Sequence, residues 1–320
     1  MAVYTQVSAE EMAALLDRYN GGQLVSAKGI AEGVENSNYL VETDLSRFIL
    51  TLYEKRVDAG DLPFFLKLLD HLADKGNPVP RALKDSDGVQ IQTVAGRPAC
   101  LIEFLQGVSV SHPTAGQAHA AGAALGRMHA GLADFEETRP NTLGLAGWRA
   151  LATRCGDDLD AIQPGLKQRV EDELAFLEAH WPHHLPKAVV HADLFPDNVL
   201  MLGETVTGVI DFYFACTEIR AWDVAVTHSA WCFESDGTGY HADNARELIA
   251  GYDESFGLSA EERAAFAVLA RGSCLRFLLT RAWDWLNTPA DAMVTRKDPI
   301  AFLRRLDFYR DADLKNLLGA

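Results

Sequence analysis

The spacing of apolar residues divides the chain into a strand-rich first part and a helix-rich second part. A capping box at Ser8 to Glu11 opens a helix that is expected to end near Asn20. Short apolar runs bounded by turn residues then predict strands over 24–30, 39–43, 48–53, 89–94 and 99–105. The first three are expected to form an antiparallel meander, and an amphipathic helix is expected over 61–75.

Beyond residue 114 the apolar positions recur at helical spacing. Helices are expected over 118–130 and 166–180, and from about 242, 260 and 300. The order of elements predicts an α+β protein with two lobes. The first is a small antiparallel β-rich lobe over 1–105, and the second is a larger, mainly helical lobe over 106–320.

One β-hairpin is predicted inside the helical part. A short apolar strand at 199–202 and a β-branched strand at 206–210 flank a Gly-Glu turn. Asn198 directly precedes the first strand, and Asp211 directly follows the second. A hairpin folded at this turn brings the Asn198 and Asp211 side chains to the same end of the paired strands.

This hairpin and the loop before it contain the side chains that phosphoryl transfer requires. Transfer of a γ-phosphoryl group needs a metal ion against the phosphates and an acceptor hydroxyl aimed in line. Mg²⁺ prefers hard oxygen ligands and usually takes one or two from the protein, which Asn198 and Asp211 supply. Asp193 is then free to face the acceptor hydroxyl as general base, and His191 is expected to pin the loop through hydrogen bonds. The sequence therefore predicts an ATP-dependent phosphotransferase that uses Mg²⁺.

The pattern His-x-Asp-x-x-x-x-Asn, followed by Ile-Asp-Phe, resembles the signature of the aminoglycoside phosphotransferase and choline kinase-like superfamily, whose fold is protein-kinase-like. Ala192 stands where protein kinases have Arg, and Tyr213 stands where they have Gly. These departures argue against a regulated protein kinase. The resemblance covers nearly the whole chain and implies the two lobes of a kinase. It also implies a supporting role for Asp223, which lies in a motif that anchors the catalytic lobe.

The resemblance further implies that ATP lies between the lobes. Segment 29–38 is at the place of the phosphate-covering loop, and the strand that ends at 103–105 leads into the hinge, whose backbone binds adenine. The implied nucleotide-binding residues are Asn36, Ser37, Asn38, Glu103 and Leu105. Taken alone, the same segments also fit an ordinary hairpin tip and a buried strand edge.

The third strand departs from the kinase pattern. Thr51 stands where a phosphate-binding Lys is expected, and nearby Lys55 is not an evident substitute. The helix that would supply the Glu partner of that Lys, over 62–72, contains no Glu. The usual ion pair is therefore missing on both sides.

The acceptor site is predicted in an apolar helix over 272–286, which carries Arg276, Arg281 and Asp284. Buried charges persist only when they are paired or used. An amino-acid acceptor needs an Arg fork for its carboxylate and an acidic group for its ammonium, whereas aminoglycosides and choline need no arginine. These three residues are the substrate-binding candidates. A local salt bridge between Arg281 and Asp284 is the alternative.

Several further segments resemble the phosphotransferase-like bacterial homoserine kinases. They are Asn36–Tyr39, Ile49–Glu54, Asn141–Leu145, Leu275–Phe277 and Lys297–Pro299. This resemblance implies ATP-dependent phosphorylation of the side-chain hydroxyl of L-homoserine, giving O-phospho-L-homoserine for threonine synthesis, and it makes Thr51 a family feature. Two alternatives stay open: a phosphotransferase for an aminoglycoside, choline-like or sugar acceptor, and a non-catalytic nucleotide-binding module.

Composition narrows the location and the partners. The 320 residues are 48% hydrophobic and carry a formal net charge of −16, with no Lys/Arg run of the kind that binds nucleic acid. No window approaches the length of a membrane span, and the five Cys, which include no Cys-x-x-Cys pair, fit buried free thiols. We expect a cytoplasmic protein whose partners are ATP and a small amino acid, with neither nucleic acid nor membrane. No motif indicates an oligomeric state.

Overall fold

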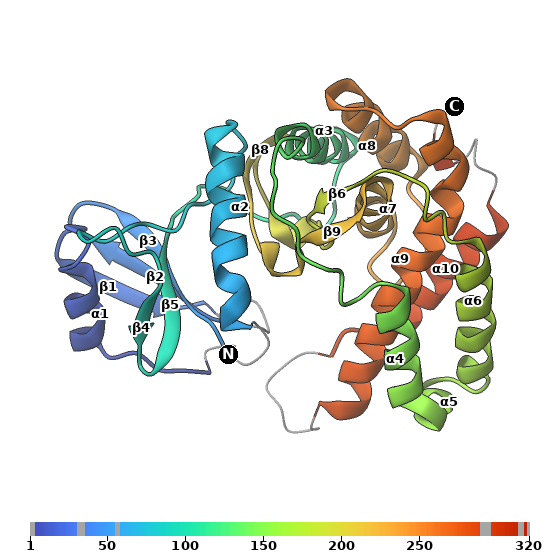
Figure 1. The fold of residues 1–320 in the computed structure, drawn as a ribbon, viewed down its shortest axis with the longest axis horizontal. Helices are drawn as coiled ribbons and strands as arrows, with labels where there is room; N and C mark the ends of the chain where they lie inside the picture. The colour runs from blue at the N-terminus through green and yellow to red at the C-terminus, as the bar shows by residue number, and fades with distance from the viewer. Residues whose placement is uncertain (1–3, 31–35, 55–57, 289–295, 313–316, 319–320) are drawn as a thin grey trace. The chain divides into compact units, whose positions relative to one another are not determined.

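A computed structural model describes residues 4–30, 36–54, 58–288, 296–312 and 317–318 (Figure 1). The described residues form two compact units. The first unit is built from the chain up to Gln106 together with Gly208–Tyr213, and the second from Gly107–Thr207 and the described chain from Phe214 on. A β-rich first unit and a mainly helical second unit confirm the predicted fold class.

The first unit is built on one five-stranded sheet with the order β1-β2-β3-β5-β4. All neighbouring strands are antiparallel, and β1, β2 and β3 form the predicted meander. The strands are β1 (Leu24–Gly29), β2 (Ser37–Thr43), β3 (Arg47–Leu52), β4 (Gln92–Val94) and β5 (Arg97–Glu103). The expected strand at 89–94 is shorter than predicted because the Asp85 carboxylate accepts the Val89 backbone N–H at 2.8 Å, which folds this stretch into a turn.

Two helices accompany this sheet. Helix α1 (Ala9–Leu16) begins at Ser8, where the predicted capping box is present, and it ends before the expected Asn20. Its Met12 side chain packs with Leu50 of β3 in a buried apolar cluster. Helix α2 (Leu62–Asp74) has seven buried residues, and a proline follows its first residue, where the missing N–H costs no hydrogen bond.

The second unit is mainly helical. Its helices are α3 (Ala115–Gly131), α4 (Leu145–Cys155), α5 (Leu159–Ile162), α6 (Leu166–His180), α7 (Arg220–Trp231), α8 (Ala242–Ser255), α9 (Ala260–Asn287) and α10 (Ile300–Asp311). Strand β6 (Lys187–Val190) pairs antiparallel with β9 (Cys216–Ile219). The predicted hairpin is present as β7 (Val199–Leu202) paired with β8 (Thr205–Val209), whose last two residues belong to the first unit.

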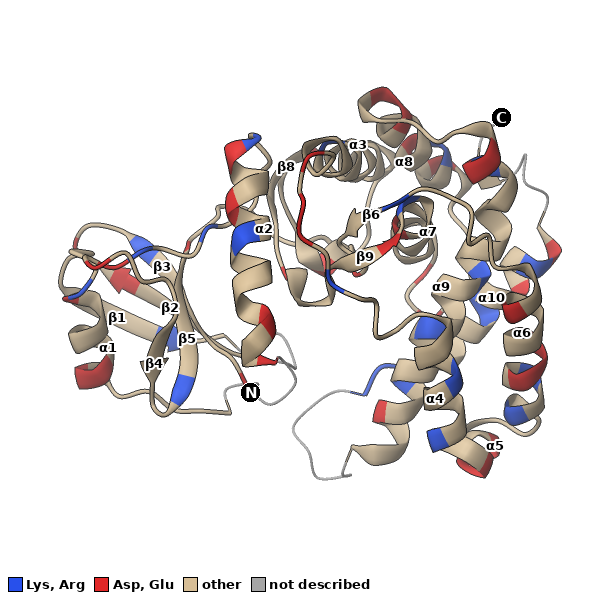
Figure 2. Ribbon diagram, viewed as in Figure 1, with Lys and Arg blue, Asp and Glu red and all other residues tan. Residues whose placement is uncertain are grey.

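Charged side chains of both signs are interspersed on the helices, as α6 illustrates in Figure 2. Within the described ranges, every helix is too short or too polar to cross a bilayer. All five cysteines are buried free thiols, as predicted.

Helices α3 and α8 pack with their backbones in close contact. A Cβ atom at Gly122 would overlap the carbonyl oxygen of Leu248, and one at Gly251 would overlap the carbonyl oxygen of His119. Neither obstacle is a flexible side chain, so each helix needs glycine at the contact. This pairing also fixes α3 beside α8, and α3 carries His129, a residue of the site described below.

We predict that Gly122→Ala lowers the free energy of unfolding by about 1–3 kcal/mol, because the added methyl group forces the two helices apart. Gly116→Ala is the matched control in the same helix, since its Cβ would meet only the flexible carboxylate of Glu204. Chemical denaturation of both variants measures the difference. A Gly122→Ala protein as stable as the control would contradict the close packing.

Candidate active site

The predicted catalytic residues lie in a loop between β6 and β7. This loop runs from His191 to Asn198 and contains Ala192 with φ of +65°. Asp211, which follows β8 by two residues, also has φ of +65°. Only four non-glycine residues of the described chain have positive φ, and these two lie in the predicted motif. Such conformations persist where surrounding contacts enforce them, and they cluster at functional sites.

The Asp223 carboxylate holds the strained turn. It lies in the first turn of α7, and it accepts the backbone N–H of His191 at 2.8 Å and that of Ala192 at 2.7 Å. The Asp223 side chain is fully buried. Burial by itself raises the pKa of Asp223, but the hydrogen bond and charge of His129, with further help from His191, hold that pKa below its ordinary value. Asp223 is therefore a buried carboxylate that stays ionised and binds the loop backbone.

His129 extends this network across three helices. Its Nε2 lies 3.2 Å from Asp223 Oδ2, and its Nδ1 lies 2.9 Å from the hydroxyl of Tyr252 in α8. A hydrogen-bonded chain thus runs from α8 through α3 and α7 to the loop. Sequence reasoning missed this chain, because no local pattern links a helical histidine to a distant carboxylate.

Asp193 is held by bonds within the loop. Its backbone N–H donates to His191 Nδ1 at 3.2 Å, so His191 pins the loop through a hydrogen bond. Asn198 Nδ2 donates to the Asp193 carbonyl oxygen at 2.8 Å and to its carboxylate at 3.2 Å. The Asn198 amide thus turns its nitrogen to Asp193, which leaves its oxygen as the atom that suits a cation. Burial raises the pKa of Asp193, and the charge of Arg276 opposes this rise.

Two further side chains bind carbonyl groups of the same loop. Arg276 of α9 donates through Nη1 to the Ala192 carbonyl oxygen, and its Nη2 lies 3.7 Å from Asp193 Oδ1. Trp231 of α7 donates its indole N–H to the Leu194 carbonyl oxygen at 2.9 Å. Neither contact was predicted. The loop is therefore held through both its N–H and its C=O groups.

Arg281 lies one to two turns further along α9. Its guanidinium donates to the Asp298 carbonyl oxygen at 3.2 Å and lies 4.5 Å from the Phe302 ring centre. Burial lowers the pKa of Arg281 to about 10, while Asp193 and Asp197 act in the opposite direction. Arg281 is thus a partly exposed cation on the same helix as Arg276. For Asp284, the backbone carbonyl accepts the Thr288 N–H at 2.9 Å.

In the first unit, the side chains predicted to bind phosphate are used in local hydrogen bonds. Ser37 Oγ accepts the Tyr4 N–H at 2.8 Å and donates to Glu54 at 2.8 Å, while Asn36 Oδ1 accepts the Glu54 N–H at 3.3 Å. Asn38 Oδ1 accepts the hydroxyl of Thr51 at 2.7 Å. These bonds engage the Ser37 hydroxyl and the amide oxygens of Asn36 and Asn38 within the first unit. Residues 31–35 of the predicted loop lie outside the described residues, as does Lys55.

The strand that leads to the predicted hinge ends at Glu103. The Glu103 carboxylate accepts the Arg81 N–H at 3.0 Å, so its side chain is used within the first unit. Leu105, two residues further on, is partly buried. Thr51 is only 3% exposed, so a buried hydroxyl takes the position at which kinases have a lysine.

Acidic, histidine and cysteine side chains are the usual protein ligands of metal ions. Over the ranges that the structure describes, no three of them gather into a metal cluster. The Asp211 carboxylate and the Asn198 amide oxygen are each hard oxygen donors of the kind that divalent cations take.

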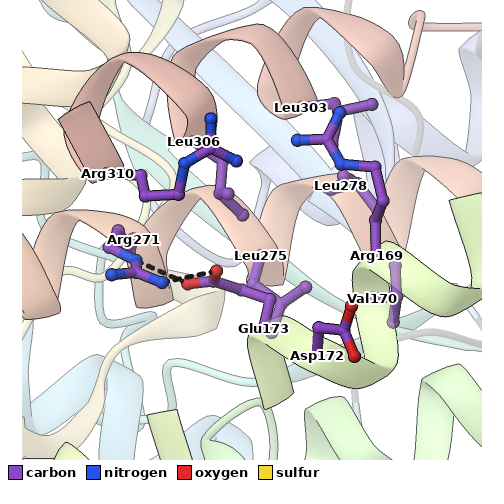
Figure 3. Close-up of a pocket in the computed structure, with 10 residues that line it drawn as sticks. All are labelled: Arg169, Val170, Asp172, Glu173, Arg271, Leu275, Leu278, Leu303, Leu306 and Arg310. Carbon is purple, nitrogen blue, oxygen red and sulfur yellow. Dashed lines mark hydrogen bonds and ion pairs between the residues drawn. The ribbon is translucent and has the colours of Figure 1, made fainter. Parts of the chain in front are cut away.

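A pocket of about 200 Å³ lies between α6, α9 and α10, and no residue of the loop 191–198 lines it (Figure 3). Arg271 forms two hydrogen bonds of 2.7 Å with Glu173 inside it. Arg169 and Arg310 both pair with Asp307. The cations of this pocket are thus already matched by carboxylates, and the pocket offers no surplus positive charge to a phosphate.

Comparison with known proteins assigns the chain to a family. The model of the phosphotransferase enzyme family matches residues 26–265, so the chain belongs to that family. A homoserine kinase of Zymomonas mobilis subsp. mobilis is 58% identical over 319 residues, which cover 99% of each chain. A homoserine kinase of Azorhizobium caulinodans is 52% identical and covers 97% of this chain and 96% of its own.

Solved structures support the fold. A spectinomycin phosphotransferase bound to ADP and spectinomycin has a TM-score of 0.73 at 14% identity, covering 98% of this chain and all of its own. An amicoumacin kinase with AMP-PNP and Ca²⁺ has a TM-score of 0.71, also at 14% identity, covering 95% of this chain and 93% of its own. The fold is therefore that of the protein-kinase-like phosphotransferases, as predicted.

We predict that Asp223→Asn lowers the free energy of unfolding by about 2–4 kcal/mol at pH 7, since an amide cannot accept both loop N–H groups without turning its own NH₂ toward one of them. The folded pKa of Asp223 lies below the unfolded value of about 3.9. Its contribution is therefore complete above that value and is lost as the pH falls through the folded pKa.

Denaturation curves of the variant and wild type between pH 7 and pH 3 measure this contribution. The difference between the two proteins should shrink below about pH 4. Asp236→Asn is the control, because the Asp236 carboxylate accepts the Thr238 N–H and hydroxyl in an exposed turn. Equal stability of the two variants at pH 7 would contradict the role of Asp223.

Proposed function

We propose that the chain catalyses ATP-dependent phosphorylation of the L-homoserine side-chain hydroxyl, giving O-phospho-L-homoserine and ADP. The product feeds threonine biosynthesis. The observation that carries this proposal is the similarity to the Zymomonas homoserine kinase, which is 58% identical over nearly the full length of both chains. The loop with Asp193 and Asn198, followed by the hairpin that leads to Asp211, supplies the catalytic groups that such an enzyme needs.

Asp193 is the residue that acts on the acceptor. Its carboxylate orients the homoserine hydroxyl and takes its proton as the oxygen bonds to the γ-phosphorus of ATP. The bond from that phosphorus to the bridging oxygen breaks, and ADP leaves. Asn198 keeps the carboxylate in place, because its amide donates to both the side chain and the carbonyl oxygen of Asp193.

Asn198 and Asp211 are the ligands we propose for Mg²⁺. When bound, the ion neutralises charge that develops on the ATP phosphates. The amide oxygen of Asn198 and the carboxylate of Asp211 are hard donors, and the β7–β8 hairpin connects the two positions. The first lobe, over 1–105, would bind the nucleotide through the backbone of Asn36–Asn38 and of the hinge after Glu103. The second lobe, over 106–320, would provide the catalytic and acceptor groups.

Arg281 is the cation we propose for the homoserine carboxylate. It is partly exposed, and it lies on the same helix as Arg276, whose side chain reaches the loop that contains Asp193. Asp284, three residues further along α9, is the proposed partner of the substrate ammonium. Arg276 was a second candidate for the carboxylate, but its contacts support a different role. A cytoplasmic location without nucleic-acid or membrane partners completes the proposal.

The decisive prediction is turnover in a coupled ADP-release assay with Mg²⁺ and ATP. L-Homoserine, L-serine, choline, kanamycin and a methylthio-sugar are compared in parallel. We expect turnover with homoserine, at a kcat/KM at least about tenfold above any other acceptor. Preference for another compound would keep the reaction class and replace the substrate. ATP binding without turnover on any acceptor would favour a non-catalytic module, the alternative that the missing Lys and Glu pair left open.

Two substitutions separate the roles of the acidic residues. Asp193→Asn should lower kcat by about 100-fold or more and leave ATP affinity nearly unchanged, because the carboxylate acts in the transition state. Asp211→Ala should weaken Mg²⁺-dependent ATP binding as well as turnover. Kinetics and calorimetric titration with Mg²⁺ and ATP measure both effects. Normal turnover in Asp193→Asn, or normal ATP binding in Asp211→Ala, would contradict the corresponding assignment.

A further inference from the structure

Arg276 is an unusual residue in the apolar part of α9. Its side chain is only 2% exposed, although it carries a full charge. The guanidinium is packed among aromatic rings, with the ring centres of Phe277, Phe214 and Trp222 at 4.4, 5.1 and 5.6 Å. Burying a guanidinium is unfavourable unless its N–H groups are used in strong interactions. Its interactions therefore indicate what this residue does.

The guanidinium is directed at the catalytic loop. Its Nη1 donates to the carbonyl oxygen of Ala192, and its Nη2 lies 3.7 Å from the Asp193 carboxylate. Both contacts are made within the second unit. The planar fork of an arginine can address two acceptors at once, whereas a lysine offers a point charge. Arg276 thus contacts both the peptide group before Asp193 and the Asp193 carboxylate.

Ala192 explains why such a connection is needed. Its φ of +65° is a left-handed conformation that alanine adopts at a cost and that glycine adopts freely. Asp223 accepts the N–H groups of His191 and Ala192 on the amino side of this residue. Arg276 binds the carbonyl group on its carboxyl side. The two buried charges therefore hold the strained residue from both ends.

We infer that Arg276 is a positioning residue, which enforces the left-handed turn at Ala192 and thereby aims the Asp193 carboxylate at the acceptor hydroxyl. This inference deepens the proposed function and rests on it. It separates the two arginines of α9: Arg276 acts through the loop, and Arg281 binds the substrate. A misplacement of the carboxylate by about 1 Å lowers turnover by roughly 100-fold, which sets the scale of the effect.

The test compares Arg276→Met, Arg276→Lys and Arg281→Ala in steady-state kinetics with homoserine. Arg276→Met should lower kcat by about 10- to 100-fold with little change in homoserine KM. Arg276→Lys should lie between this variant and wild type. Arg281→Ala should instead raise homoserine KM by about tenfold or more. A higher KM with normal kcat in Arg276→Met would make Arg276 a substrate ligand and overturn the inference.

A second substitution at Ala192 tests the mechanism directly. Glycine at this position needs no enforcement, so Ala192→Gly should restore kcat of Arg276→Met by about fivefold. An effect of Arg276 that arises only from lost packing would not be rescued in this way. No recovery in a folded double variant would overturn the inference. If Arg276→Met does not fold, the same comparison is made with Arg276→Lys.

Arg305→Met is the matched control. Arg305 is also a buried arginine, 3% exposed, and it donates to the carbonyl oxygens of Ser229, Glu234 and Ser235. Its loss should lower stability and leave kcat per folded molecule unchanged, and Ala192→Gly should give no rescue. A fall in kcat that Ala192→Gly also rescues in this background would show that the rescue is not specific to Arg276.

Hydrogen–deuterium exchange tests the inference without the substrate. Amides of residues 191–195 should exchange faster in Arg276→Met than in wild type, and they should be unaffected in Arg305→Met. If wild type is silent on homoserine, the proposed function fails, while faster exchange still supports the positioning of the loop. Unchanged exchange in Arg276→Met overturns the inference even where homoserine is turned over.

Discussion

The buried carboxylate of Asp223 is the group on which the geometry of the loop over 191–198 depends. It replaces its lost hydration with N–H groups of His191 and Ala192 and with the imidazole of His129. An ionised carboxylate without such partners would be strongly unfavourable in a fully buried position. The same bonds satisfy backbone groups of a loop that has no sheet or helix partners for them. The same hydrogen bonds therefore offset the desolvation of the Asp223 carboxylate and order the loop.

The surrounding helices hold Asp223 and its hydrogen-bond partners in place. Asp223 lies on α7, His129 on α3 and Tyr252 on α8, and α3 and α8 are in backbone contact through Gly122 and Gly251. A shift of any one helix would lengthen bonds to a charged group, where a lost bond is expensive. The loop over 191–198 is thus held in a fixed position relative to the core of the helical unit. This arrangement suits a reaction in which most of the catalysis comes from positioning and electrostatics.

The sequence predicted much of the fold because the relevant signals are local. The bounds of α6 and β7 agree with the apolar pattern, and the capping box at Ser8 begins α1. The short strands β6 and β9 were not predicted, since four residues are too few to show a period and their pairing joins distant segments. Strand β4 was predicted too long, because a side-chain bond from Asp85 redirected the backbone at Val89.

The spacing of Asp193, Asn198 and Asp211 predicts their catalytic and metal-binding roles from the chemistry of phosphoryl transfer, and those roles stay a prediction. The contacts that support the loop did not follow from this spacing. The contacts of Arg276 with Ala192 and of Trp231 with Leu194 join residues far apart in the chain, and no periodicity encodes them. An isolated charge in an apolar helix was a usable signal that Arg276 has a function, but it could not distinguish a substrate ligand from a loop ligand.

Ala192 brings these observations together. A glycine at this position would adopt the left-handed turn without strain, so the turn would depend less on contacts from the surrounding helices. Alanine disfavours the left-handed turn, so the contacts of Asp223 and Arg276 have to hold it in that conformation. The conformation of the peptide next to the catalytic aspartate is then determined by two buried charges on α7 and α9. The orientation of the Asp193 carboxylate therefore depends on correct packing of α7 and α9 in the helical unit.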